Sequence, residues 1–67
     1  MNSFAKNLTE LMKGNETSQG QLAIALGVKQ QTISRYVKGI REPDIDVIIA
    51  IAKYFEVTTD YLLGVGD

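Results

Sequence analysis

Two adjacent glutamines and a nearby arginine are the side chains of this sequence best suited to specific chemistry. Gln30, Gln31 and Arg35 occupy one short segment, with Ser34 beside them and no acidic residue between them. A glutamine amide offers a donor and an acceptor together, as the N6 and N7 edge of adenine requires. A guanidinium offers two donors to O6 and N7 of guanine. These residue types therefore fit hydrogen bonding to the edges of bases.

A helix over residues 30–38 would turn these side chains outward. At ~100° per residue, the apolar residues share one face; they are Ile33, Tyr36, Val37 and Ile40. The polar residues fall nearly opposite, with Ser34 at the edge and Gln30 at the N-terminal tip; they are Gln31, Arg35 and Lys38. An ordinary solvated face is the alternative, but such a face more often mixes Glu with Lys.

Hydrophobic periodicity predicts five short helices and no strand, at about 3–14, 19–26, 30–38, 44–55 and 59–63. Ser18 and Gln21 have the spacing of a capping box, and Asp44 and Thr58 are candidate caps. Gly27 and Gly39 are the expected stops of the second and third helices, because glycine adopts the left-handed conformation at no steric cost. The expected fold is a compact all-α bundle.

Length and composition limit the function classes. A chain of 67 residues allows one domain, 1–67. It contains no cysteine and no histidine, and no glycine-rich phosphate loop ending in Lys-Ser or Lys-Thr. We therefore expect no enzyme activity, no catalytic residue, no metal and no cofactor. The nearly apolar run 45–52 is shorter than the ~20 residues that cross a bilayer, and the N-terminus lacks a secretion signal. A cytoplasmic protein without a membrane partner is predicted.

The net charge of −1 alone argues against binding to nucleic acid, but the charges are unevenly distributed. The segment 17–41 has no acid and four basic residues, namely Lys29, Arg35, Lys38 and Arg41. The segment 42–67 has six acids and one lysine. One basic surface on an otherwise acidic molecule is therefore predicted, and such asymmetry decides partner choice more than the sum does.

The second and third predicted helices are joined by about three residues that include Gly27, which is the helix-turn-helix arrangement. Together with the pattern around it, this segment resembles the phage repressor and Cro-type regulators of the XRE family over residues 4–64. The matching residues are Ser18-Gln19, Gln21-Leu22-Ala23, Leu26-Gly27-Val28, Thr32-Ile33-Ser34-Arg35, Gly39, Pro43, Ala52-Lys53, Val57 and Asp60-Tyr61-Leu62-Leu63.

The resemblance implies a lambda-repressor-like five-helix domain that binds double-stranded DNA sequence-specifically, with its third helix in the major groove. A transcriptional regulator is expected, above all a repressor. The implied base-reading residues are Gln30, Gln31, Ser34 and Arg35. The implied phosphate contacts are Gln19, Lys29, Lys38 and Arg41. For Gln19 the alternative is solvation of a helix start, and Lys29 could equally be a merely exposed side chain.

Three departures from the family pattern carry predictions. Met12 and Val37 replace an Arg and a Glu that form a buried ion pair in many members, and we expect Met12 to pack on Val37. Replacing both partners avoids the cost of one buried unpaired charge. Lys29 stands where a Ser or Thr would cap the third helix, which predicts a weaker helix start. Ile40 replaces a residue that is often basic.

One helix reads about four base pairs, so the resemblance predicts a homodimer on a near-palindromic operator, with half-sites ~34 Å apart. Two apolar stripes follow the segment 44–55; they are Val47, Ala50, Ile51, Tyr54 and Ile45, Ile48, Ala52, Phe55. A helix in so small a domain rarely buries both. An exposed remnant with Val47, Ile40 or Tyr54 would suit a dimer contact, and Ile24 could also be exposed. Core packing is the alternative for each of them.

A different function class also fits the sequence. The pI near 5.2 favours a helix-turn-helix interaction module, or an antitoxin, with weak or no DNA binding. Salt-dependent binding to random duplex DNA separates the two classes. The chain end after Leu62-Leu63-Gly64 is compatible with a complete small regulator and with the DNA-binding part of a longer one.

Overall fold

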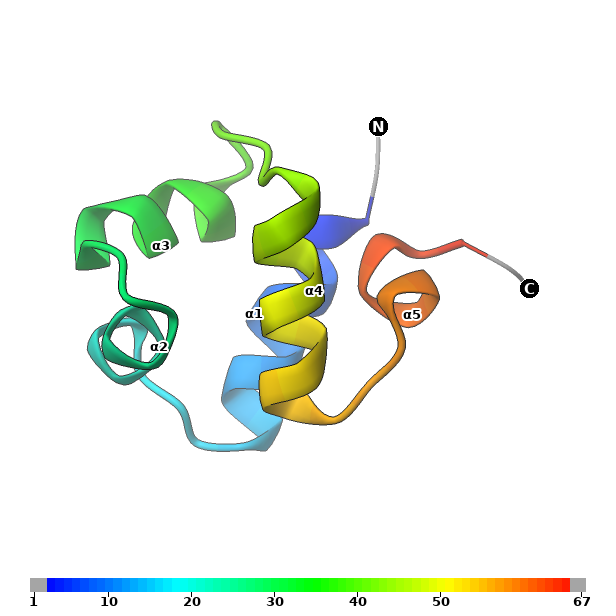
Figure 1. Cartoon of the computed structure of the whole chain (residues 1–67), viewed down its shortest axis with the longest axis horizontal. Helices are drawn as coiled ribbons and strands as arrows, with labels where there is room; N and C mark the ends of the chain where they lie inside the picture. The colour runs from blue at the N-terminus through cyan, green and yellow to red at the C-terminus, as the bar shows by residue number, and fades with distance from the viewer. Residues whose placement is uncertain (1–2, 66–67) are drawn as a thin grey trace.

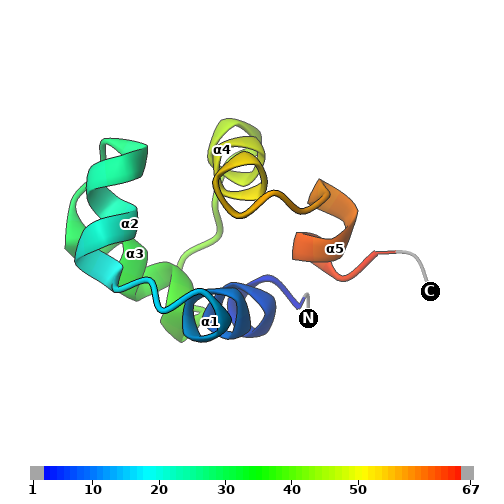
Figure 2. The same cartoon turned by 90° about the horizontal axis from the view of Figure 1, so that it is seen from below.

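The computed structural model describes residues 3–65, and within them the chain forms five helices and no strand. They are α1 (Phe4–Gly14), α2 (Gln19–Leu26), α3 (Gln30–Lys38), α4 (Ile45–Phe55) and α5 (Thr59–Leu63). In Figures 1 and 2, α2 and α3 lie on one side of α1 and α4, and α5 lies on the other side. The predicted all-α five-helix bundle is confirmed.

Two helices begin one residue later than predicted. Ser3 and Asp44 are N-cap residues, outside the helical conformation, so α1 begins at Phe4 and α4 at Ile45. The Asp44 carboxylate accepts a hydrogen bond from the backbone N–H of Val47 at 3.0 Å. This confirms Asp44 as the cap, because its side chain satisfies an N–H that has no partner within the helix.

The predicted capping box of α2 is formed in full. The Ser18 hydroxyl accepts from the backbone N–H of Gln21 at 3.0 Å, and the Gln21 side chain accepts from the backbone N–H of Ser18 at 2.8 Å. At the other end, Gly27 has φ +71° and its N–H donates to the Ile24 carbonyl at 3.2 Å. Local chemistry thus defines both ends of α2.

Each helix contributes one fully buried side chain to a single core; the five are Leu8, Leu22, Ile33, Ile51 and Leu62. Phe4 and Tyr36 join this core as an edge-to-face pair, with ring centroids 5.9 Å apart. No polar or charged side chain among residues 3–65 is buried. The core is therefore held by apolar packing of all five helices.

One expectation about apolar faces was wrong, and one was confirmed. Ile40 does not share the buried face of Ile33, because Gly39 turns the chain out of α3 and leaves Ile40 71% exposed. On α4, neither predicted stripe is buried as a unit. Ile48, Ile51 and Ala52 are buried, whereas members of both stripes face outward; these are Ile45 and Tyr54.

The remnant predicted for a dimer contact is also partly different. Ile40 and Tyr54 are exposed as expected, but Val47 packs against the core. Ile45 and Ile49 are exposed in addition, at 65% and 39%. Three of the exposed apolar side chains, Ile40, Ile45 and Ile49, therefore fall within one short segment.

Candidate nucleic-acid interface

The second and third helices cross steeply. In Figure 1, α3 runs across the view whereas α2 is seen along its axis, and Figure 2 shows α2 lengthwise. Ala23 is buried in α2, and its carbonyl accepts the backbone N–H of Val28 at 3.0 Å just beyond the turn. A small side chain at this position allows the two helices to cross closely. The two helices and the turn through Gly27 form a helix-turn-helix.

The buried and the exposed side chains of α3 lie on the two faces that the helical wheel predicted. Ile33 and Tyr36 are buried in the core and Val37 is half-buried against it. The polar side chains on the other side are exposed; they are Gln30, Gln31, Arg35 and Lys38. Ser34 is half-buried at the boundary. The four predicted base-reading residues thus share one accessible surface, and their contact with bases stays a prediction.

Gln30 lies against the first turn of α2. A Cβ placed on Gly20 would lie 3.4 Å from Oε1 of Gln30, an ordinary van der Waals contact, so the Gln30 amide lies beside the backbone of Gly20. Gln31 and Arg35 are also exposed residues of α3. The sequence had no signal for Gly20 as a neighbour of Gln30, because the contact joins the starts of two helices that cross.

Lys29 begins α3 without capping it. It has the extended conformation of an N-cap, with φ −77° and ψ 148°, but its side chain makes no cap hydrogen bond. Its carbonyl accepts the backbone N–H of Thr32 at 3.0 Å. The predicted absence of a side-chain cap is confirmed, and the exposed Lys29 ammonium is left available to a phosphate.

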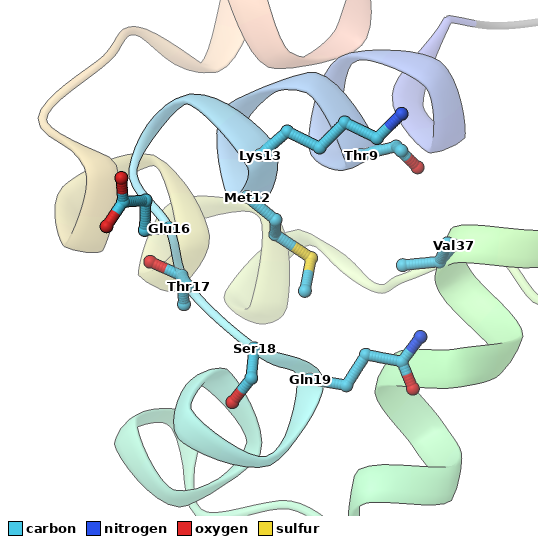
Figure 3. Close-up of a pocket in the computed structure, with 8 residues that line it drawn as sticks. All are labelled: Thr9, Met12, Lys13, Glu16, Thr17, Ser18, Gln19 and Val37. Carbon is cyan, nitrogen blue, oxygen red and sulfur yellow. The ribbon is translucent and has the colours of Figure 1, made fainter.

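An open hollow of about 480 Å³ separates α1 from the helix-turn-helix. Met12 and Val37 line it and face each other across it in Figure 3. Met12 is buried and Val37 packs against the core, so the two apolar residues share the site predicted for them. The hollow between them stays open, and direct packing of one on the other stays a prediction.

Gln19 lies on the rim of the same hollow. Its side chain extends toward α3 in Figure 3 and is half-buried. A phosphate contact by Gln19 stays a prediction.

Two further predicted phosphate contacts meet at the C-terminal end of α3. Lys38 and Arg41 line a second hollow, of about 370 Å³, and both side chains are exposed. Lys6 of α1 lines it as well. Our sequence reasoning missed Lys6, because only the packing of α1 on α3 brings it beside residues so distant in the chain.

The described residues contain no group of three or more side chains that could hold a metal ion. Among the helices of residues 3–65, none has the length and apolar character needed to cross a membrane.

The fold and the exposed surface of α3 define a class of protein, the helix-turn-helix domains of transcriptional regulators. A family model described as helix-turn-helix matches residues 8–62. The chain belongs to this family, which is that of the XRE-type regulators, and the resemblance seen in the sequence is confirmed.

Relatives carry the names of transcriptional regulators. The chain is 32% identical to the HTH-type transcriptional regulator ImmR of Bacillus subtilis over 62 residues. This alignment covers 92% of this chain and 49% of ImmR. The chain is 37% identical over 57 residues to AnsR of Bacillus subtilis, covering 85% of this chain and 49% of AnsR. It is 37% identical over 61 residues to the transcriptional activator BcrR of Enterococcus faecalis, covering 91% of this chain and 30% of BcrR.

A solved structure has the same fold. The crystal structure of a transcriptional regulator from Listeria innocua matches with a TM-score of 0.93 and 34% identity, over 100% of this chain and 63% of that one. The chain spans about half the length of ImmR and AnsR. These relatives carry the names of transcriptional regulators, and their family is one of DNA-binding regulation.

Proposed function

We propose that this protein is a cytoplasmic transcriptional regulator that binds double-stranded DNA sequence-specifically through α3 in the major groove. The observation that carries the proposal is the accessible, acid-free face of α3, with Gln31 and Arg35 at its centre and Gln30 at its tip. Amide and guanidinium groups in this arrangement match the donors and acceptors of adenine and guanine edges.

The charges around α3 support the same orientation. Residues at the N-terminal end of a recognition helix reach base edges, while cations beyond its ends meet the backbone. Lys29 precedes α3, and Lys38 and Arg41 lie at its far end. Both ends of α3 thus carry positive charge. In the proposed complex, these charges would lie near the sugar-phosphate backbones on the two sides of the groove.

We propose that two copies pair on a near-palindromic operator. One α3 reads about four base pairs, whereas two related by a two-fold axis read half-sites ~34 Å apart. The exposed side chains Ile40, Ile45 and Ile49 supply an apolar contact for a second copy. A two-fold axis makes such a contact self-complementary, because each copy contributes the same side chains.

Repression is the proposed outcome of binding. A small domain blocks transcription by occupying an operator, whereas activation also requires a productive surface toward the transcription machinery. A reporter gene behind the selected operator tests this: expression should fall when the protein is present, and a rise would assign it to activators.

Selection of bound duplexes from a random pool tests the DNA-binding proposal. We expect a salt-dependent affinity for all duplexes, because contacts to phosphates release counterions. We also expect enrichment of one two-fold symmetric site. A protein that binds no duplex even at low salt would refute the proposal and favour the interaction module or antitoxin.

Two variants with the same change in net charge sharpen the selection. Gln31→Glu places an acid on the outer face of α3 and should abolish enrichment. Lys53→Gln changes an exposed residue of α4, and should enrich the same site as the unaltered protein. Equal behaviour of the two variants would mean that the outer face of α3 does not read the DNA.

A further inference from the structure

The first turn of α1 packs on the C-terminal end of α3. The Phe4 and Tyr36 rings meet edge to face, with an interplanar angle of 81°. A Cβ placed on Gly39 would lie 3.7 Å from Cβ of Ala5. These two contacts fix the position of the α1 segment that bears Lys6 relative to the end of α3.

Three cations from three parts of the chain line the hollow at this junction. Lys6 comes from α1, Lys38 from the last turn of α3, and Arg41 from the connection to α4. Among the described residues that line the hollow, Glu42 is the one acid, so their three positive charges exceed the negative charge by two. All four side chains are exposed and accessible to a ligand from solution.

We propose that Lys6 acts with Lys38 and Arg41 as a phosphate-binding site, and that its ligand is a phosphodiester of the DNA backbone. This proposal rests on the proposed function, because the hollow lies at the end of the helix that enters the groove. With α3 in the major groove, its C-terminal end would approach the backbone that borders the groove, and the packing of α1 on this end would bring Lys6 toward the same backbone. Lys6 thus extends the contact surface from the helix-turn-helix to the first helix.

The salt dependence of binding to a mixed-sequence duplex tests the role of Lys6. Lys6→Gln removes one cation, and we expect weaker binding to every sequence and a salt slope smaller by about 1. Lys6→Arg keeps the charge and should keep the slope. Lys53→Gln removes an equal charge from α4, outside the hollow, and should also keep the slope.

Glu42→Gln should change the affinity for DNA in the opposite direction. Removal of the acid from the hollow should tighten binding to all duplexes alike, because it no longer repels the phosphate. Circular dichroism checks that each variant is folded. If Lys6→Gln and Lys53→Gln have the same affinity and slope, the Lys6 site is wrong while DNA binding stands. If the unaltered protein binds no duplex at low salt, both the proposed function and the proposed phosphate site are refuted.

Discussion

In the proposed complex, Arg35 is the side chain whose geometry most restricts which base α3 can read. Its guanidinium is a rigid fork of donors that matches O6 and N7 of guanine, and it is exposed between Gln31 and Lys38 on the outer face. A lysine could not replace it, because an ammonium is a point charge without the planar pair of donors. At the scale of the residue, the hydrogen-bonding capacity of Arg35 follows from its residue type. The fold has only to keep the guanidinium accessible.

Arg35→Ala should weaken binding to the selected operator by about 1–3 kcal/mol and relax the preference at one base pair of each half-site. Affinities for the operator and for single-base variants, at one salt concentration, measure this. Lys38→Ala is the control and should weaken all of these duplexes by the same factor. An equally uniform loss for Arg35→Ala would assign Arg35 to a phosphate.

At the scale of the element, α3 begins without a side-chain cap hydrogen bond, as α1 does. The caps of α2, α4 and α5 each accept a backbone N–H through a side-chain oxygen; they are Ser18, Asp44 and Thr58. Lys29 has the backbone conformation of a cap but no such oxygen. Under the proposed function, the helix that enters the groove thus begins with a cation in place of a cap, which favours phosphate binding over stability.

Lys29→Ser should raise the free energy of unfolding relative to Lys29→Ala by about 1 kcal/mol, because serine can accept a hydrogen bond from an N–H of the first turn. Both variants remove the same charge, so their difference isolates the cap. Urea unfolding followed by circular dichroism measures it. Equal stabilities would show that the start of α3 is held by packing alone.

At the scale of the whole molecule, one side chain joins the first helix to the last. Asn7 Nδ2 donates to the carbonyls of Tyr61 and Leu62 at 2.9 and 3.3 Å. These carbonyls lie in the last turn of α5, where backbone acceptors lack partners within the helix. Asn7 therefore holds the short α5 over the core beside its buried Leu62.

Asn7→Ala should lower the free energy of unfolding by about 1 kcal/mol, the typical net worth of a hydrogen bond within a protein. Asn15→Ala is the matched control, because the Asn15 amide donates only to the Leu11 carbonyl of its own helix, at 2.8 Å. The loss at Asn15 should be smaller. An equal loss at both positions would contradict a role for Asn7 in docking α5.

The proposed dimer is also a property of the whole molecule. Ile45→Ser should leave the stability of the monomer nearly unchanged, because this side chain is 65% exposed. It should lower affinity for the full operator about tenfold, or ~1.4 kcal/mol, with no change for an isolated half-site. Ile24→Ser, at an 84% exposed position of α2, is the control and should change neither affinity. The same loss on full and half-sites would place the dimer contact elsewhere.

The sequence by itself determined the features that depend on near neighbours in the chain. Three such features depend only on residues a few positions apart, so residue spacing predicts them. They are the Ser18–Gln21 capping box, the left-handed stop at Gly27 and the polar outer face of α3. The five helices followed to within one residue at their starts.

Only the tertiary structure decided which apolar residues are buried and which charges meet. Ile45 and Ile51 are alike in type, yet one is exposed and the other fully buried, because burial depends on where the other helices pack around α4. Lys6 lies beside Lys38 because the Phe4 and Tyr36 rings join α1 to α3. Such contacts join distant parts of the chain, and no local spacing encodes them.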